Sequence, residues 1–243
     1  MRARLAKYKI GEKALSKKKK QKKTDERGSR FFRVIYALLA GIVGRIFRIT
    51  VVNREKEPDR GGYVVVANHV SATDPIMICY SFRKHQVHFM AKKELFKIPV
   101  FSGFIRMLGA FPIDRGGNDV GAIRNAVSIV EDGRCLGIFP QGHRYPGEDP
   151  RQTKTKNGAA LIATKVSAPI VPVYIWHKGN KGGPFRKTYV IIGDMIPFEE
   201  LGYDKDASGE YTRITGIAFD RVCALGESFD PVEYKKGKKS KKK

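Results

Sequence analysis

Apolar and polar positions alternate along this chain in blocks that predict strands and helices in turn. Short apolar runs bounded by glycine, proline or charged residues are typical of buried strands, and they occur at residues 49–54, 63–67, 86–90, 110–113, 134–139, 169–175 and 187–192. Apolar residues at intervals of three and four predict helices at residues 75–82, 99–108, 119–131, 158–166 and 209–228. This alternation predicts an α/β fold with a mixed, largely parallel sheet flanked by helices.

Local signals refine three of these elements. Asp74 precedes Pro75, an order that predicts an N-cap followed by a proline at the first helical position. Pro169 and Pro172 bracket an apolar strand, which we expect at an edge or end of the sheet, or in the wall of an apolar pocket. The polar segment 141–157 is longer than a simple connection, so we expect a loop that contributes to a site.

Positive charge is concentrated at the two ends of the chain. The net charge is +23, but residues 1–30 and 235–243 together hold 20 Lys and Arg against 3 acids, which leaves +6 for the 204 residues between them. Basic tails bind anionic lipid or nucleic-acid phosphates. Stacked aromatics and a basic folded face are both lacking in the sequence pattern, so we expect no nucleic-acid partner.

The segment after the first tail favours lipid. Within residues 31–48 the uncharged run 34–44 has 11 residues, whereas crossing a bilayer takes about 20. At about 100° per residue, the apolar side chains of residues 31–48 share one arc of the helix, and the arginines of this segment lie opposite them. The pattern predicts a helix in the membrane interface, next to lysines that attract anionic headgroups. An amphipathic helix packed on the protein's own core is the alternative.

The chain therefore divides into four expected parts. These are a basic tail that is disordered or partly helical (residues 1–30), the membrane-interface helix (31–48), a folded domain (49–230) and a Lys-rich tail (231–243). Cys79, Cys135 and Cys223 are widely spaced and show no disulfide or metal pattern. We expect Cys135 and Cys223 to be small core residues, and a reducing compartment suits all three cysteines.

The strongest chemical signal follows the apolar run 63–67. His69 and Asp74 lie five residues apart across a turn that leads from this strand into a helix. Such strand ends are where α/β proteins carry reactive groups. A histidine oriented by a carboxylate can take the proton of a hydroxyl group, so His69 is the candidate base and Asp74 its partner.

Two later strand ends carry groups that suit an anion or a polar ligand. Arg115 precedes a glycine pair at a helix start, where a guanidinium and backbone donors suit phosphate; a surface arginine in an ordinary turn is the alternative. A second loop presents Gln141, Gly142 and Arg144 after a buried strand. Glycine lets the backbone approach a ligand, while Gln and Arg bind hydroxyl and phosphate groups. His143 in this loop is more typical of a hydrogen-bonding or bystander residue than of a second base.

Taken in order, these segments resemble the glycerolipid acyltransferase family, which includes the 1-acyl-sn-glycerol-3-phosphate acyltransferases. The resemblance covers residues 31–200 and rests on four motifs: Asn-His-x4-Asp at Asn68, His69 and Asp74, a Gly followed by Arg at Gly109 and Arg115, Phe-Pro-Glu-Gly-Thr-Arg at Phe139, Pro140, Gly142 and Arg144, and Val-Pro-Val at Val171, Pro172 and Val173. Gln141 and His143 replace the Glu and Thr that are usual in the third motif. Gln keeps an acceptor oxygen and gains an NH2 donor, but it has no charge.

The resemblance implies transfer of an acyl chain from acyl-CoA or an acyl carrier protein to the sn-2 hydroxyl of lysophosphatidic acid, giving phosphatidic acid. It implies a glycerolipid acyltransferase-like fold over residues 49–230, and neither cofactor nor metal. His69 would be the base and Asp74 its partner; the acceptor phosphate and glycerol would be bound by Arg115, Gln141, Gly142 and Arg144.

The resemblance also suggests where the lipid lies. We expect the acyl chain in an apolar channel formed partly by residues 96–108, and the protein at the cytoplasmic face of the cell membrane, peripheral or monotopic, on an anionic surface. Acylation of glycerol 3-phosphate or another lysolipid is the nearest alternative. A non-catalytic basic protein that binds lipid or nucleic acid is an alternative of a different class.

Overall fold

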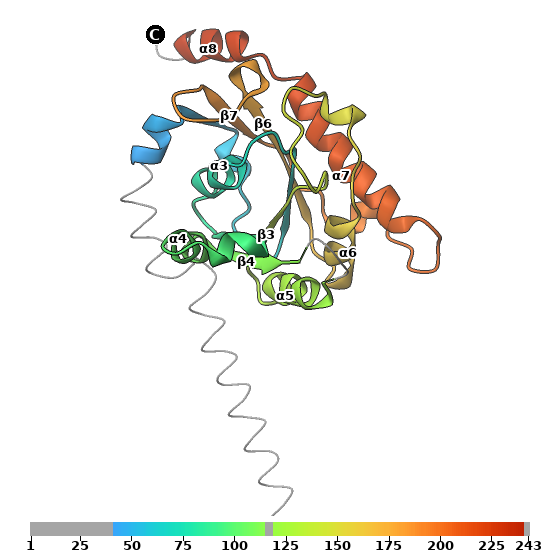
Figure 1. Cartoon of the computed structure of the whole chain (residues 1–243). Helices are drawn as coiled ribbons and strands as arrows, with labels where there is room; N and C mark the ends of the chain where they lie inside the picture. The colour runs from blue at the N-terminus through green and yellow to red at the C-terminus, as the bar shows by residue number, and fades with distance from the viewer. Residues whose placement is uncertain (1–40, 115–118, 241–243) are drawn as a thin grey trace, which may run out of the picture.

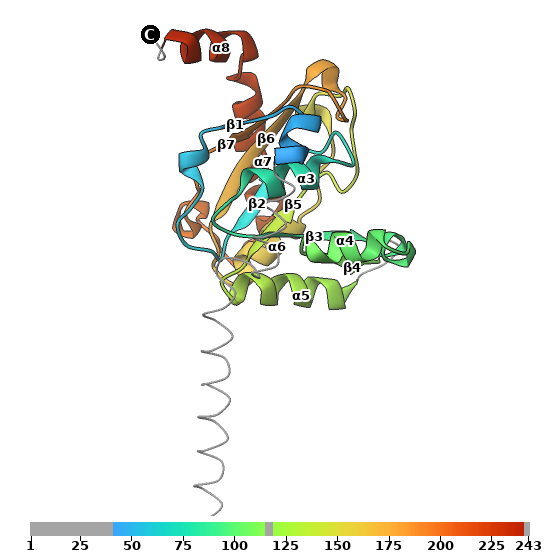
Figure 2. The same cartoon turned by 90° about the vertical axis from the view of Figure 1, so that its left-hand side faces the viewer.

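One β-sheet runs through the centre of the molecule (Figures 1 and 2). The computed structural model describes residues 41–114 and 119–240, and in these residues seven strands pair in the order β1-β7-β6-β2-β5-β3-β4. Along the chain the strands are β1 (Ile49–Val52), β2 (Val64–Ala67), β3 (Val87–Lys92), β4 (Ala110–Ile113), β5 (Cys135–Ile138), β6 (Ile170–His177) and β7 (Thr188–Ile192). Neighbours are parallel except β6 and β7, which are antiparallel. The prediction of a mixed, largely parallel sheet is confirmed.

Helices cover both faces of the sheet. One face packs against α5 (Val120–Glu131), α6 (Gly158–Lys165) and α7 (Glu210–Glu227), and the other against α3 (Asp74–Ser81). Strand β2 is apolar throughout because it is buried on both sides. Val64 and Val66 contact the side of α5, α6 and α7, whereas Val65 and Ala67 contact the side of α3.

Further helices lie at the edges of the sheet. Helix α4 (Phe101–Met107) and the 3-10 helix η2 (Lys93–Lys97) lie beside edge strand β4, as both views show. At the opposite edge α8 (Pro231–Ser240) packs Tyr234 against Tyr189 and Phe229. Residues 231–240 of the expected Lys-rich tail are therefore helical. The remaining 3-10 helices are η1 (Arg54–Lys56), η3 (Pro150–Gln152), η4 (Lys178–Asn180) and η5 (Phe198–Leu201).

Strand β6 does not lie at an edge, contrary to one of the readings of its two prolines. It lies between β2 and β7, in the interior of the sheet. The backbone nitrogen of Pro172 is on the side of β7, as is the N–H of Ile170 two residues earlier. There the antiparallel ladder stops at the pair Val173–Ile192 and resumes only as an isolated bridge between Ile170 and Ile196. The missing N–H of Pro172 thus coincides with an interruption of the ladder, which is how a central strand tolerates proline.

Several predictions concern residues outside the described ranges. These are the basic tail 1–30, Arg115 and most of the interface helix 31–48, of which residues 41–46 are described and helical. Among the helices of the two described ranges, none combines the length and the apolar character that crossing a membrane requires. The membrane-interface assignment of residues 31–48 stays a prediction.

Candidate active site

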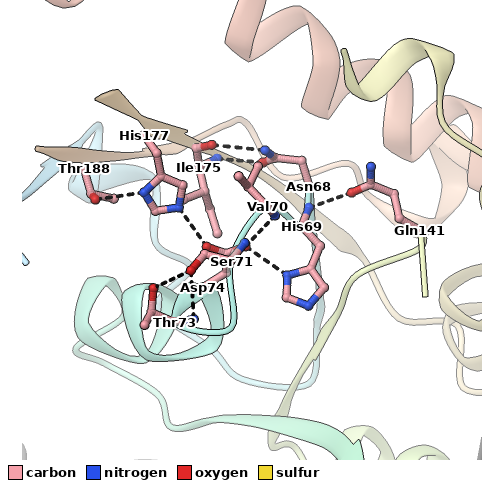
Figure 3. A network of polar contacts seen from close by, with 10 residues as sticks. All are labelled: Asn68, His69, Val70, Ser71, Thr73, Asp74, Gln141, Ile175, His177 and Thr188. Atoms are coloured by element: carbon pink, nitrogen blue, oxygen red, sulfur yellow. Dashed lines mark hydrogen bonds and ion pairs between the residues drawn. The ribbon is translucent and has the colours of Figure 1, made fainter. Parts of the chain in front are cut away.

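The carboxyl ends of β2 and β6 bring four polar side chains together (Figure 3). These two strands are parallel neighbours, so they end at the same edge of the sheet, and α3 begins beside them. Asn68 and His69 follow β2, Asp74 is the first residue of α3, and His177 is the last residue of β6. Asn68, Asp74 and His177 are buried, and His69 is about one-eighth exposed, with 12% of its side chain accessible.

His69 and Asp74 are in contact, as the sequence predicts. Nδ1 of His69 lies 2.9 Å from Oδ2 of Asp74, and the same oxygen accepts the N–H groups of Val70 and Ser71 at 2.7 Å each. Asp74 is therefore not the N-cap of α3, because its side chain turns back to hold the preceding loop; the N-cap is Thr73. Burial by itself would raise the pKa of the Asp74 carboxyl, but its hydrogen bonds to two histidines outweigh burial and hold that pKa below its usual range.

A column of aromatic rings holds the imidazole of His69. Its ring stacks on Phe139 with centroids 4.2 Å apart, and Phe139 stacks on Phe89 at 5.6 Å. Gly137 makes this column possible, because a Cβ there would lie 2.1 Å from the ring of Phe89. With Nδ1 turned to Asp74, Nε2 is the nitrogen on the far side of the ring (Figure 3).

His69 lines a cavity of about 590 Å³. Most of the lining is apolar and comes from β3, β4, β5, α5 and α6, namely Met90, Ile113, Val120, Ile123, Ile138 and Leu161. No residue of the segment 96–108 lines this cavity. The prediction that this segment forms part of an apolar channel is therefore wrong for this cavity. An apolar cavity that begins at a candidate base suits an acyl chain or another long apolar group.

His177 was missed by the sequence analysis. Its Nε2 lies 2.8 Å from Oδ1 of Asp74, and its Nδ1 lies 3.0 Å from the hydroxyl oxygen of Thr188 on β7. The available signal was a histidine closing an apolar strand at the same edge of the sheet as His69. It was not recognised because His177 lies over 100 residues along the chain, and pairing of β6 with β2 had to be known first.

Asn68 and Gln141 hold the backbone of the site. Asn68 exchanges two hydrogen bonds with the backbone of Ile175, at 2.7 and 3.0 Å, and so extends the ladder between β2 and β6 by one residue. Gln141 accepts the N–H of His69 at 2.6 Å and donates to the hydroxyl of Thr153 at 2.8 Å. Only 2% of Gln141 is exposed, so the expected contact with a substrate glycerol is not supported. Its side chain positions His69.

The cationic side of the site is only partly described. Arg115 lies outside the described residues. Arg144 is exposed on the loop after β5, and its neighbour Tyr145 donates its N–H to the carbonyl of His69 at 2.9 Å. Gly142 lines the cavity with φ of 73°, and a Cβ there would lie 3.1 Å from Cε of Lys156. Lys156 itself lines the cavity and was also missed; its signal was a lysine within the expected site loop.

The cysteines contribute nothing to this site. All three are buried and none forms a disulfide. Burial raises the pKa of Cys79 and of Cys135 to about 12, so both remain thiols at neutral pH. Within residues 41–114 and 119–240, no three or more His, Cys, Asp or Glu side chains are arranged to hold a metal ion.

Comparison with known proteins gives consistent matches. Residues 48–176 match the family described as Acyltransferase. The chain is 33% identical over 152 residues to the 1-acyl-sn-glycerol-3-phosphate acyltransferase of Bacillus subtilis, covering 61% of this chain and 73% of the relative. It is 31% identical over 193 residues to that of Borreliella burgdorferi, covering 76% and 72%. The fold is similar to the crystal structure of the 1-acyl-sn-glycerophosphate (LPA) acyltransferase PlsC from Thermotoga maritima, with a TM-score of 0.59, 24% identity and coverage of 82% and 80%.

Proposed function

Because the chain belongs to the acyltransferase family, we propose that it transfers an acyl chain to the sn-2 hydroxyl of 1-acyl-sn-glycerol 3-phosphate, giving phosphatidic acid. The observation that carries the proposal is the pairing of His69 with the buried carboxylate of Asp74 at the mouth of an apolar cavity. A hydroxyl group bound at Nε2 of His69 would lie where a lipid tail can enter the same cavity. The names of the relatives supply the acceptor.

His69 acts as general base and then as general acid. Its Nε2 takes the proton of the acceptor hydroxyl while that oxygen attacks the thioester carbonyl carbon, forming a C–O bond and a tetrahedral oxyanion. Collapse of this intermediate breaks the C–S bond, and the proton on Nε2 passes to the departing thiolate. Asp74 accepts from Nδ1 throughout, so it fixes the imidazole tautomer and stabilises the imidazolium that forms. The acceptor supplies the nucleophile, so none is required from the protein.

The acceptor phosphate is bound by cations at the polar rim of the cavity. Lys156 lines the cavity beside Gly142, and Arg144 lies on the loop that Tyr145 ties to His69. Arg115 follows β4, whose last residue Ile113 lines the same cavity. A lysine acts as a point charge and an arginine as a bidentate fork, so together they suit a phosphate monoester.

The acyl donor is an acyl thioester, either acyl-CoA or an acyl carrier protein. Both donors are anionic, which the cationic rim favours. The apolar lining from Met90 to Leu161 suits an acyl chain, and its volume of about 590 Å³ is typical of a small-molecule site.

A membrane surface is the proposed partner of the segment that we call the arm, residues 93–107 of η2 and α4. Three of its apolar side chains are exposed, Ile98 at 48%, Val100 at 91% and Phe101 at 41%. Lys97 and Arg106 lie among them and are exposed too. Apolar side chains flanked by cations are typical of a surface that binds anionic lipid. We place the protein as a peripheral enzyme on the cytoplasmic face of the cell membrane, where the lipid acceptor is.

The proposal is tested by thioester consumption with purified protein. We expect turnover with lysophosphatidic acid and far less with glycerol 3-phosphate as acceptor. His69→Ala should abolish turnover, by three or more orders of magnitude, because no other group replaces the base. Binding of the variant to anionic liposomes should be unchanged. Preference for glycerol 3-phosphate would favour the sister activity, and turnover retained by the variant would remove His69 from the mechanism.

A further inference from the structure

Asp74 is held by two imidazoles, not one. Oδ2 receives His69 and two backbone N–H groups, and Oδ1 receives Nε2 of His177 at 2.8 Å (Figure 3). The two histidines differ in access: His69 lines the cavity, whereas the side chains of His177 and Asp74 have no exposure at all. The proposed reaction uses His69 and leaves His177 without a function.

The other side of the His177 ring also has a hydrogen-bond partner. Its Nδ1 lies 3.0 Å from the hydroxyl of Thr188, which can donate to a bare nitrogen. A neutral ring that donates from Nε2 to Asp74 and accepts at Nδ1 from Thr188 satisfies every group in this buried chain.

The loop between β6 and β7 closes this arrangement off from solvent. Gly182 lies so close that a Cβ on it would meet the Oγ of Ser71 at 2.6 Å and Cε1 of His177 at 3.1 Å. The backbone of this loop therefore covers the ring of His177 and the turn that Asp74 holds.

We propose that His177 is a positioning residue for the acyl transfer, which fixes Asp74 as an ionised carboxylate with Oδ2 aimed at His69. This inference rests on the proposed function. The Nε2–H of His177 donates to Oδ1, so the carboxylate cannot rotate, or take up a proton at this position, without losing a hydrogen bond. Asp74 is then ready to stabilise the imidazolium of His69 without reorganisation, which is the advantage of a preorganised site.

The inference predicts a pH effect whose sign follows from hydrogen bonding to the charged form. A donor to a carboxylate favours its ionised state, so removing that donor raises the pKa of the Asp74 carboxyl. The acid limb of the pH–activity profile, on which activity rises with pH, should then move to higher pH. Among the residues that the structure describes, the titratable side chain that a polar contact joins to the pair of Asp74 and His69 is His177. The connection from β6 to β7 also carries Lys178 and Lys181, which are exposed, and Lys187, whose Nζ lies 5.1 Å from the ring centre of Tyr189.

Two substitutions separate this effect from loss of packing. His177→Leu fills the space but donates nothing, whereas His177→Gln places an amide N–H the same number of bonds from the backbone as Nε2. For the Leu variant we expect kcat to fall at least about tenfold, an unchanged KM for the acceptor and an acid limb about 1 pH unit higher. The Gln variant should recover most of kcat and the acid limb of the unchanged protein.

Nitrogen NMR of the histidine side chains gives a readout that needs no turnover. In the full-length protein we expect a hydrogen-bonded proton on Nε2 of His177 and on Nδ1 of His69, and a changed Nδ1–H signal of His69 in His177→Leu. A His177 ring without a proton on Nε2, or a Leu variant in which the acid limb and the Nδ1–H signal of His69 are both unchanged, would overturn the inference. If the unchanged protein shows no acyl transfer, the proposed function fails, and the NMR arms still decide the arrangement of His177, Asp74 and His69.

Discussion

The strand-end cluster and the arm are built in opposite ways. In the cluster, formed by His69, Asp74 and His177 with the residues that hold them, both oxygens of Asp74 are bonded and two of the three side chains are fully buried. In the arm, α4 buries a single residue, Ile105, while Val100 is 91% exposed and adopts a φ of 64° that β-branched residues rarely occupy. Reacting groups require fixed geometry, whereas a surface for lipid requires exposed apolar area, so the two regions suit the different functions proposed for them.

The largest effect that would break this contrast is expected at Gln141. Gln141→Leu removes the acceptor for the N–H of His69 and the donor to Thr153, both buried. If the cluster works by positioning, kcat should fall about 10- to 100-fold with little change in KM for the acceptor. The reason is that His69 is displaced while the binding of the substrate is unchanged. Steady-state kinetics with lysophosphatidic acid would measure both constants.

Gln141→Glu is the matched control for that loss. A carboxylate can still accept the N–H of His69, and the Thr153 hydroxyl, which now donates to Pro150, can turn to donate to it. Activity within about tenfold of the unchanged protein is therefore expected. A Leu variant whose KM rises while kcat is unchanged would restore the sequence-based interpretation, in which Gln141 binds the glycerol part of the acceptor.

Sequence patterns predicted the local contacts of the cluster, but not the contacts that depend on how distant strands pair. The strand before His69, the helix after it and the contact of His69 with Asp74 are local features. Five residues and one turn are enough to bring these two side chains together. His177 joins them only through the pairing of β2 with β6. The prolines of β6 left open an edge or end of the sheet and the wall of a pocket, because the interruption opposite Pro172 cannot be seen in the sequence. Gln141 was assigned to substrate for a similar reason: an amide on a loop looks available until the fold turns it inward.

The prediction for the arm also failed because the sequence does not show what covers an apolar face. Its helix was predicted from apolar spacing, and those apolar residues were assigned to an interior channel. Periodicity identifies an apolar face but not what covers it. In the fold the arm lies beside edge strand β4, where Ile98, Val100 and Phe101 point outward instead of into the cavity.

A smaller effect, at the arm, would sharpen the contrast from the other side. Replacing both Val100 and Phe101 by Asp removes two exposed apolar groups and adds two negative charges to a basic surface. We expect binding to anionic vesicles to weaken about tenfold and KM for lysophosphatidic acid presented in vesicles to rise several-fold. Turnover of a short-chain, water-soluble acceptor should be unchanged, because the strand-end cluster is intact.

Val232→Asp provides the control for added charge at an exposed apolar position. Val232 is 55% exposed on α8, at the opposite edge of the sheet from the arm (Figure 1). Vesicle binding that drops equally in this variant would mean that any exposed valine contributes, and the arm would lose its assignment as the membrane-facing segment.

The smallest expected effect comes from a carboxylate that is bonded as fully as Asp74 but lies away from the cavity. Glu210, at the start of α7, accepts from Nε and Nη2 of Arg213 at 2.6 and 2.7 Å and from the N–H of Asp204 at 2.9 Å. The hydrogen bond with Arg213, followed by that with Asp204, lowers the pKa of Glu210 from 4.5 to about 2. The folded-state pKa is depressed, so the stability contributed by Glu210 is complete above pH 4.5 and is lost as the pH falls toward 2.

Glu210→Gln should lower Tm by about 1 to 3 °C at pH 7 and leave kcat unchanged, with the two unfolding curves converging near pH 2. The control Glu199→Gln, at an exposed position, should change neither Tm nor kcat. A fall in kcat for Glu210→Gln would mean that hydrogen-bonded carboxylates influence turnover wherever they lie, and the special status of the strand-end cluster would rest on His69 alone.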